Sequence, residues 1–339
     1  MKKIVIAFMA LLVWGQGRVC AQTSSVNIAT TAVPFLRISP DARAAGMGDM
    51  GVATRPGGGA DDVFHNLSKL PFAAASSGVS VNYTPWMHDV VDGVYLATVS
   101  GYHQLDENQA VGVGFRYFNI GDYAVTDYSG NKLGAAHPRE LALDGGYTRK
   151  LSSTLSLGLA FRYIHSDLAN GTVNGTSYKA GNALATDASM SFLKDGFSAG
   201  LVLSNLGTKI NYTNDATQKS SLPTSLGFGL GYTTTIEEVN QLTFGVEANH
   251  LLNPGSAEEY QGAMGVEYVY DHLLSLRTGY HVGDKAKGDQ SFFTAGAGLR
   301  FQWAQIDVSY LAGSGNGVTR NPLSNTVRLG LSFALGKKK

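Results

Sequence analysis

Near its end the 339-residue chain reads Thr326-Val327-Arg328-Leu329-Gly330-Leu331-Ser332-Phe333-Ala334-Leu335. Apolar side chains occupy the odd-numbered positions, and polar or small ones occupy the even-numbered positions. Because successive side chains of a β-strand point to opposite faces, this spacing predicts a strand with one apolar and one polar face. The same period recurs and predicts fourteen strands, centred near Val81, Ala97, Val113, Leu143, Leu159, Ala188, Leu201, Phe228, Phe244, Met264, Leu276, Ala295, Val308 and Leu329.

The polar face of these strands carries balanced charge among many Gly and Ser residues and almost no Lys. Its charged members are Arg116, Asp144, Arg162, Asp187, Glu247, Glu267, Arg277, Arg300, Asp307 and Arg328. Such a face is typical of an enclosed lumen rather than of an open, solvated surface. An apolar exterior around a polar interior is the pattern of barrels that span a membrane, where closure removes the unpaired sheet edges. We therefore predict an all-β fold, a 14-stranded antiparallel transmembrane β-barrel.

The connectors between the predicted strands alternate in length. Long ones, such as residues 119–137, 165–181 and 205–222, follow odd-numbered strands, whereas even-numbered strands end in short turns such as 194–196. Outer-membrane barrels have short periplasmic turns and longer external loops, and an even strand number puts both termini in the periplasm. The pattern predicts a location in the outer membrane.

Composition excludes two other classes. The chain has 26 basic and 26 acidic residues, so it offers no excess of positive charge for binding nucleic acid. The only long apolar run lies near the N-terminus, which argues against a helical membrane protein.

The first 21 residues have the pattern of an export signal. Lys2 and Lys3 precede an apolar stretch at 4–14, and Val19-Cys20-Ala21 fits a cleavage site before Gln22. A lipoprotein signal fits badly, because a small residue would have to precede Cys20. Cleavage removes the single cysteine, so we expect no disulfide and no thiol chemistry.

Residues 22–77 lack the strand period and are expected to enter the lumen as a plug. They hold an apolar, glycine-studded stretch at 33–51 and a predicted short helix at 61–70. We expect charge-assisted pairs between plug and wall. The residues assigned to the plug contacts are Phe35, Arg37, Asp41, Arg43, Gly46 and Gly48. The predicted domains are a signal peptide (1–21), the plug (22–77) and the barrel (78–339).

Motifs of enzymes and metal sites are unconvincing in this context. Residues 46–51 fit G-x-G-x-x-G, but no strand precedes them, and glycines packing a plug against a wall explain them better. His165-Ser166-Asp167 has the letters of a hydrolase triad, yet adjacent strand residues point to opposite faces. The eight histidines show no ligand spacing. We predict no enzymatic activity, no cofactor and no metal.

The run Pro34-Phe35-Leu36-Arg37-Ile38-Ser39-Pro40-Asp41-Ala42-Arg43, followed by Gly46-Met47-Gly48-Asp49, resembles the N-terminal signature of the PorV family. The resemblance implies a barrel like that of the FadL fatty-acid transporters, with the N-terminal segment in the lumen. It also implies an outer-membrane shuttle of the type IX secretion system, a function without catalysis. Such a shuttle takes cargo proteins by their C-terminal domains from an SprA-type translocon to a PorU-type sortase, in contact with lipid and lipopolysaccharide. Where relatives often have Asn-Pro, this chain has Asn66-Leu67, which leaves the plug conformation open.

Two other functions compete with the shuttle. A FadL-like transporter of hydrophobic small molecules would need an apolar pocket and an opening in the wall. The ten charged lumen positions argue against an apolar transport route through the lumen. An outer-membrane hydrolase would need Ser and His side chains converging on the lipid face, and the sequence offers no such pair.

Overall fold

A computed structural model describes residues 31–337 apart from 57–58, 90, 127–128, 170, 174–175, 216, 253–258, 285–286, 314–320 and 322. The predicted signal peptide, residues 1–21, and the first part of the predicted plug lie outside the described residues. In the described part of the chain, helices long and apolar enough to cross a membrane are absent.

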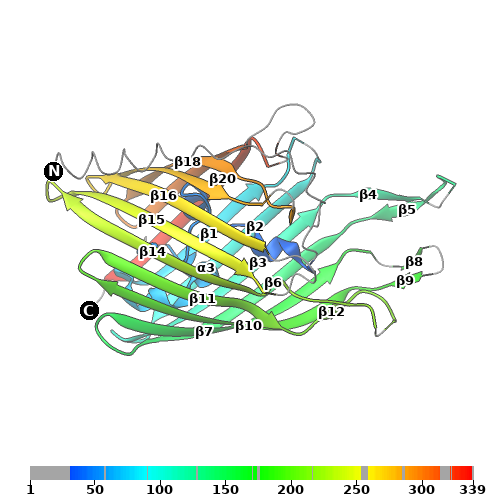
Figure 1. Ribbon diagram of the computed structural model, residues 1–339, viewed down its shortest axis with the longest axis horizontal. Helices are drawn as coiled ribbons and strands as arrows, with labels where there is room; N and C mark the ends of the chain where they lie inside the picture. The colour runs from blue at the N-terminus through cyan, green and yellow to red at the C-terminus, as the bar shows by residue number, and fades with distance from the viewer. Residues whose placement is uncertain are drawn as a thin grey trace, which may run out of the picture.

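Fourteen antiparallel strands close into one barrel (Figure 1). The barrel closes where β1 pairs with β20, with Ser77 opposite Leu335 and Tyr83 opposite Leu329. Each predicted strand centre lies within a barrel strand, so the predicted fold is confirmed. In barrel order the strands are β1 (Ala75–Pro85), β2 (Val94–Gln104), β3 (Gln109–Ile120), β6 (Arg139–Lys150), β7 (Leu155–Asp167), β10 (Gly181–Lys194), β11 (Phe197–Gly207), β14 (Ser225–Ile236), β15 (Asn240–Leu251), β16 (Glu259–Tyr270), β17 (Leu274–Val282), β18 (Phe292–Phe301), β19 (Ala304–Gly313) and β20 (Thr326–Lys337).

The two ends of the barrel differ. Three long connectors form hairpins of their own, which extend beyond one end, while short turns and the C-terminus lie at the opposite end (Figure 1). We call these the long-loop end and the short-turn end; by the rule for outer-membrane barrels the long-loop end is external. The hairpins are β4 (Tyr123–Thr126) with β5 (Lys132–Ala136), β8 (Gly171–Val173) with β9 (Thr176–Tyr178), and β12 (Ile210–Asn211) with β13 (Lys219–Ser220).

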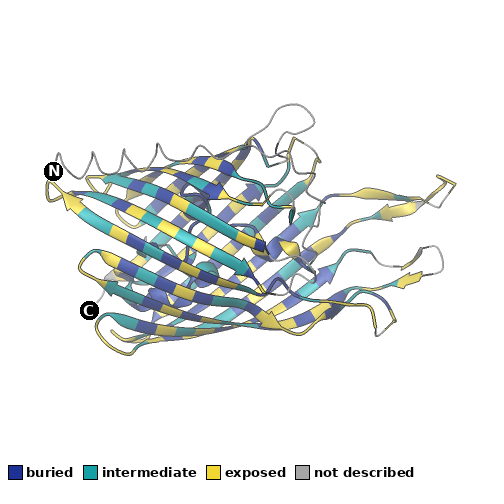
Figure 2. Cartoon of the chain, in the orientation of Figure 1, coloured by how far each residue is buried: buried dark blue, intermediate teal, exposed yellow. Residues whose placement is uncertain are grey.

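Burial alternates along the strands as the sequence period predicts (Figure 2). On β20, Leu329 and Leu331 are exposed on the outer side, whereas Arg328 and Ser332 are buried inside. An apolar outer surface of this extent is stable in contact with hydrocarbon. Aromatic rings lie near both ends of the wall: Tyr95 is 5.4 Å from Tyr83 at the long-loop end, and Trp303 is 5.6 Å from Phe333 at the short-turn end. The protein is a transmembrane β-barrel.

Residues 31–74 apart from 57–58, here called the inner segment, lie within the barrel. The segment contains η1 (Pro34–Arg37), α2 (Ala42–Ala45), α3 (Asp62–His65) and η2 (Leu67–Phe72). It runs from the long-loop end, where the Ala32 amide donates to the Ser221 carbonyl, toward the short-turn end, where Gln104 donates to the Leu70 carbonyl.

The helix predicted over 61–70 is instead two short helices. Asn66 separates them with an extended backbone, and its side chain accepts from the Ser68 amide at 3.1 Å. The same side chain donates to the Val52 carbonyl at 2.7 Å. A local side-chain hydrogen bond thus competes with the continuing helix.

Leu331→Arg should destabilise the folded barrel by about 2 to 4 kcal/mol, because it places a charge on the lipid face near the middle of a strand. Leu331 is 39% exposed and lies between Val81 and Ile306 on the neighbouring strands. Urea unfolding in lipid vesicles measures the loss. Leu331→Phe is the matched control and should stay close to the native stability. Equal stability of the two variants would contradict the outward assignment.

Candidate functional site: the barrel lumen and its outer vestibule

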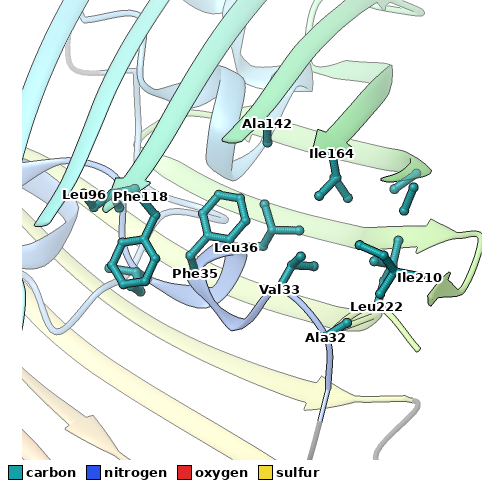
Figure 3. Packing of buried hydrophobic residues seen from close by; sticks show 13 residues of the cluster. Ala32, Val33, Phe35, Leu36, Leu96, Phe118, Ala142, Ile164, Ile210 and Leu222 are labelled. Atoms are coloured by element: carbon teal, nitrogen blue, oxygen red, sulfur yellow. The ribbon is translucent and has the colours of Figure 1, made fainter. Parts of the chain in front are cut away.

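Apolar packing joins the inner segment to one side of the wall. Near the long-loop end, Val33, Phe35 and Leu36 belong to a buried cluster with wall residues (Figure 3), and the ring of Phe35 stacks on Phe118 at 6.0 Å. The wall and loop members of this cluster are Leu96, Phe118, Ala142, Ile164, Ala183, Ala185, Ile210 and Leu222. Nearer the short-turn end, Val63, Leu67 and Leu70 form a second buried cluster with Tyr102, Ala110 and Ala160.

Two glycines of the inner segment, Gly46 and Gly48, lie against β17 and β18 on the opposite side of the wall. A Cβ atom on Gly46 would be 3.2 Å from the Cα of Gly296, and the Gly48 amide donates to Thr294 at 2.9 Å. The contact is tightest at Gly279 of β17, where a Cβ would lie 2.2 Å from the backbone carbon of Met47. Backbone-to-backbone packing of this kind needs the absence of a side chain.

Ion pairs connect the segment to β16–β20. Arg37 pairs with Glu259, and Arg43 forms a two-bond pair with Glu267, at 2.8 and 3.0 Å. Glu267 also accepts from Arg277 at 2.7 Å. Arg277 in turn donates to Asp307 at 2.6 Å. A further pair joins Asp49 to Arg328. Glu267 and Arg277 each have two charged partners, which offsets their loss of hydration.

The remaining predicted lumen charges have other contacts. Arg162 donates to Asp144 at 2.6 Å and to Asp187 at 2.8 Å. Arg116 lies 4.6 Å from the centre of the Phe64 ring and 3.6 Å from Asp144. Glu247 accepts the amides of Gly51 and Val52 at 3.0 and 2.9 Å. Arg300, by contrast, is exposed at the short-turn end of β18, where it donates to Gln305 of β19 at 2.6 and 2.9 Å.

Several polar contacts of the inner segment were not anticipated. Asp41, expected to face the wall, pairs with His65 of the same segment, and the almost fully buried Lys69 pairs with Asp62. These residues lie outside regular strands, so the sequence has no periodic pattern from which their pairing could be predicted. Glu259 is different: it shares the lumen-facing phase of Glu267 on β16, so the strand period could have identified it.

Two carboxyl groups of the inner segment have opposite pKa shifts. Burial raises the pKa of Asp61 to about 7, and the nearby Asp41 charge adds to this rise. For Asp41 burial also acts upward, but attraction and hydrogen bonding to His65 outweigh it and lower the pKa to about 2. Asp61 is therefore partly protonated near neutral pH, whereas Asp41 is ionised.

A cavity of about 510 Å³ lies between the inner segment and the wall. We call it the outer vestibule, because its lining reaches the loop residues Trp86 and Met87 at the long-loop end. Its deeper lining combines apolar, charged and amide side chains, among them Leu36, Phe64, Arg116, Val202, Asn249 and Glu259. Among the described residues, groups of three or more His, Cys, Asp or Glu placed to hold a metal ion are absent.

Solved structures similar to this chain include a transporter, a channel and a FadL homologue. The toluene transporter TodX of P. putida is 12% identical, with a TM-score of 0.59, and the match covers 88% of this chain and 99% of TodX. The monoaromatic hydrocarbon channel CymD is 13% identical, with a TM-score of 0.57 and coverages of 89% and 99%. A FadL homologue of Pseudomonas aeruginosa is 13% identical, with a TM-score of 0.52 and coverages of 87% and 98%. At these identities the likeness shows the fold, a FadL-like barrel.

The family is given by the sequence itself. The model of the type IX secretion system protein PorV matches residues 21–258, more than half of the chain. The chain belongs to the PorV family and thus to the outer-membrane part of the type IX secretion system. A search of curated proteins found no match.

Gly279→Ala should destabilise the protein by about 1 to 3 kcal/mol, because the added methyl group would overlap the backbone of residues 47–48. Gly145→Ala, also within a barrel strand, meets no atom within 4 Å and should be close to neutral. Thermal unfolding in detergent compares the two, and limited proteolysis reports release of the inner segment. Equal behaviour of both variants would argue against close packing at Gly279.

Proposed function

We propose that this protein is the cargo shuttle of a type IX secretion system. It binds the C-terminal signal domains of cargo proteins as they leave an SprA-type translocon and delivers them to a PorU-type sortase at the cell surface. The observation that carries this proposal is the match of the PorV model over residues 21–258. The role needs binding surfaces rather than catalytic groups.

The filled lumen supports a carrier rather than a pore for proteins. The inner segment is packed against both sides of the wall through apolar clusters, close glycine contacts and ion pairs. The cavity of about 510 Å³ that remains has the size of a small-ligand pocket. A folded cargo domain is far larger, so we propose that cargo is held outside the barrel. We propose residues 22–77 as a plug and residues 78–339 as the barrel around it.

The long-loop end offers a surface for such cargo. The three hairpins follow one another around the rim, and β9 is joined to the third connector by a bridge between Tyr178 and Thr213. The β4–β5 hairpin has exposed residues on both strands, including Tyr123, Ala124 and Lys132. Two-stranded hairpins are marginally stable alone in water, and a bound partner would stabilise this one.

Transport of hydrophobic molecules is the second candidate, favoured by the likeness to TodX and CymD. An apolar notch on the outer wall is lined by Leu143, Phe161, Leu184 and Leu206. Arg162 borders both this notch and the outer vestibule, and it is held there by Asp144 and Asp187. An apolar solute crossing the wall here would have to displace a buried, paired charge, which is costly. The lumen chemistry therefore favours the shuttle.

Replacing residues 123–136 with a short Gly-Ser turn should leave the barrel folded but block cargo display. Cargo should then accumulate in the periplasm with its C-terminal signal uncleaved, at least ten-fold above the wild-type level, as measured by immunoblotting of cell fractions. The β4–β5 hairpin suits this test better than the connector after β11, because Ile210 of that connector is buried with the inner segment.

A control replaces the exposed turn 237–239, at the short-turn end, with Gly-Ser-Gly and should not change display. Toluene uptake should be unaffected in both variants. Normal cargo display after deletion of the whole gene would refute the shuttle.

A further inference from the structure

The apolar notch on the outer wall lies on the lipid-facing side of the barrel. It spans β6, β7, β10 and β11 and has a volume of about 680 Å³. Leu143, Phe161, Leu184 and Leu206 line it, and each of them is exposed on the outer side of its strand. The notch is therefore continuous with the surface that hydrocarbon covers.

A bulge in the wall lies at one side of the notch. The pairing of β10 with β11 shifts register between Thr186 and Ala188. Asn205 of β11 has a left-handed backbone, with a φ of 58°, and its amide donates to the Asp187 side chain at 2.6 Å. A bulge bends the strand that carries it. The notch is found at this irregularity, because Thr186 and Leu206 belong to its lining.

Gly145 of β6 leaves the other side of the notch unfilled. It lies on the lipid-facing side of its strand, between the exposed Leu143 and Tyr147. A Cβ atom on Gly145 would meet no described atom within 4 Å, and the residue has no positive φ that would require glycine. Glycine inside a strand weakens it and often marks a place that a ligand approaches closely. Since no packing within the chain calls for this glycine, it indicates a ligand from outside.

The side chains that border this gap are more exposed than their neighbours. Phe161 is 63% exposed and Leu184 is 61% exposed, whereas Leu157 and Leu159, which face lipid on the same strand as Phe161, are 44% and 45% exposed. A side chain beside a gap loses van der Waals contacts. Lipid tails are as apolar as leucine, so close packing decides what binds at such a site. A hydrocarbon chain in the notch would restore these contacts.

The notch is closed toward the lumen. The buried Arg162 borders it and donates to Asp144 at 2.6 Å and to Asp187 at 2.8 Å. Displacing this paired charge would be costly. A hydrocarbon chain can therefore enter the notch from the membrane but cannot pass through the wall.

Polar groups at one end of the notch give the ligand a direction. On β6 the notch reaches Gly145 in the middle of the strand, whereas on β11 it reaches Leu206 and Thr208 at the long-loop end. Tyr163, also in the lining, donates through its hydroxyl group to Asn182 at 2.7 Å. Rings with a polar tip are typical of the membrane–water interface. A lipid of the leaflet at the long-loop end would thus enter near Thr208 and end near Gly145.

We propose that the notch is a lipid site, which holds one acyl chain of a lipid from the external leaflet. The chain packs over Gly145, between Phe161 and Leu143, and it stays at the wall instead of entering the lumen. This inference does not depend on the proposed shuttle function.

The test uses the purified protein in phosphatidylcholine vesicles that contain a phosphatidylcholine with a photoactivatable diazirine in one acyl chain. After irradiation, mass spectrometry maps the labelled residues. We expect the notch to be labelled about five-fold more than Val308 and Leu329 on the lipid face of β19 and β20, a ratio that corresponds to about 1 kcal/mol. A diazirine near the ester should label Leu206, and one near the terminal methyl group should label Phe161.

Gly145→Leu fills the notch with a side chain and should reduce its labelling to the level of the remaining wall. The open space around Gly145 keeps the barrel folded in this variant. Gly101→Leu is the matched control and should have no effect. Gly101 lies in the same row of the wall, because both glycines pair with Val113, and it is outside the notch lining. The heat-dependent shift in gel migration shows that each variant has a folded barrel.

Uniform labelling around the barrel, or unchanged labelling in Gly145→Leu, would overturn the inference. Reversed order of the two diazirine positions would overturn the assignment to the external leaflet. A photo-cross-linking amino acid in place of Leu184 should capture lipid in cells, and capture of a protein would overturn the lipid site in favour of a partner. Cargo display does not enter these measurements, so their failure would leave the shuttle standing.

Discussion

The structure depends on one constraint: at membrane depth, backbone hydrogen bonds have to be made within the protein. The pairing of β1 with β20 satisfies it, because that pairing removes the last two free edges of the sheet. Closure in turn fixes which face of each strand meets lipid. It also buries charged strand residues such as Arg116, Arg162 and Arg277 inside the barrel, where a charge without a partner is costly.

The inner segment provides charged partners for the buried wall charges on one side of the barrel only. Its apolar side chains pack mainly on β2–β11, while its arginines reach β16 at Glu259 and Glu267. The PorV model matches up to residue 258, so these partners lie just beyond the matched region. The segment therefore connects the two parts of the wall, and the ion pairs of its arginines form only when the later strands are in place.

The sequence was sufficient for the barrel because lipid imposes a strict two-residue period on every strand. The same period predicts charged residues on the polar face of the strands, and Glu259 fits it when the period on β16 is extended to that residue. It could not predict which charges pair, since Arg43 meets Glu267 only through closure of the barrel. The hairpins in the long connectors and the break at Asn66 were also missed, because local hydrogen bonds decide them and leave no periodic pattern.

A shared fold does not give this chain the function of its structural neighbours, because function resides in sites. Where a route for hydrophobic molecules would need an apolar gap, the wall has Arg162 between two aspartates. The paired charge of Arg162 therefore lies where an apolar solute would have to cross the wall, and displacing it would be costly. The barrel shares the fold of hydrocarbon channels, but its wall differs from an apolar route at this position.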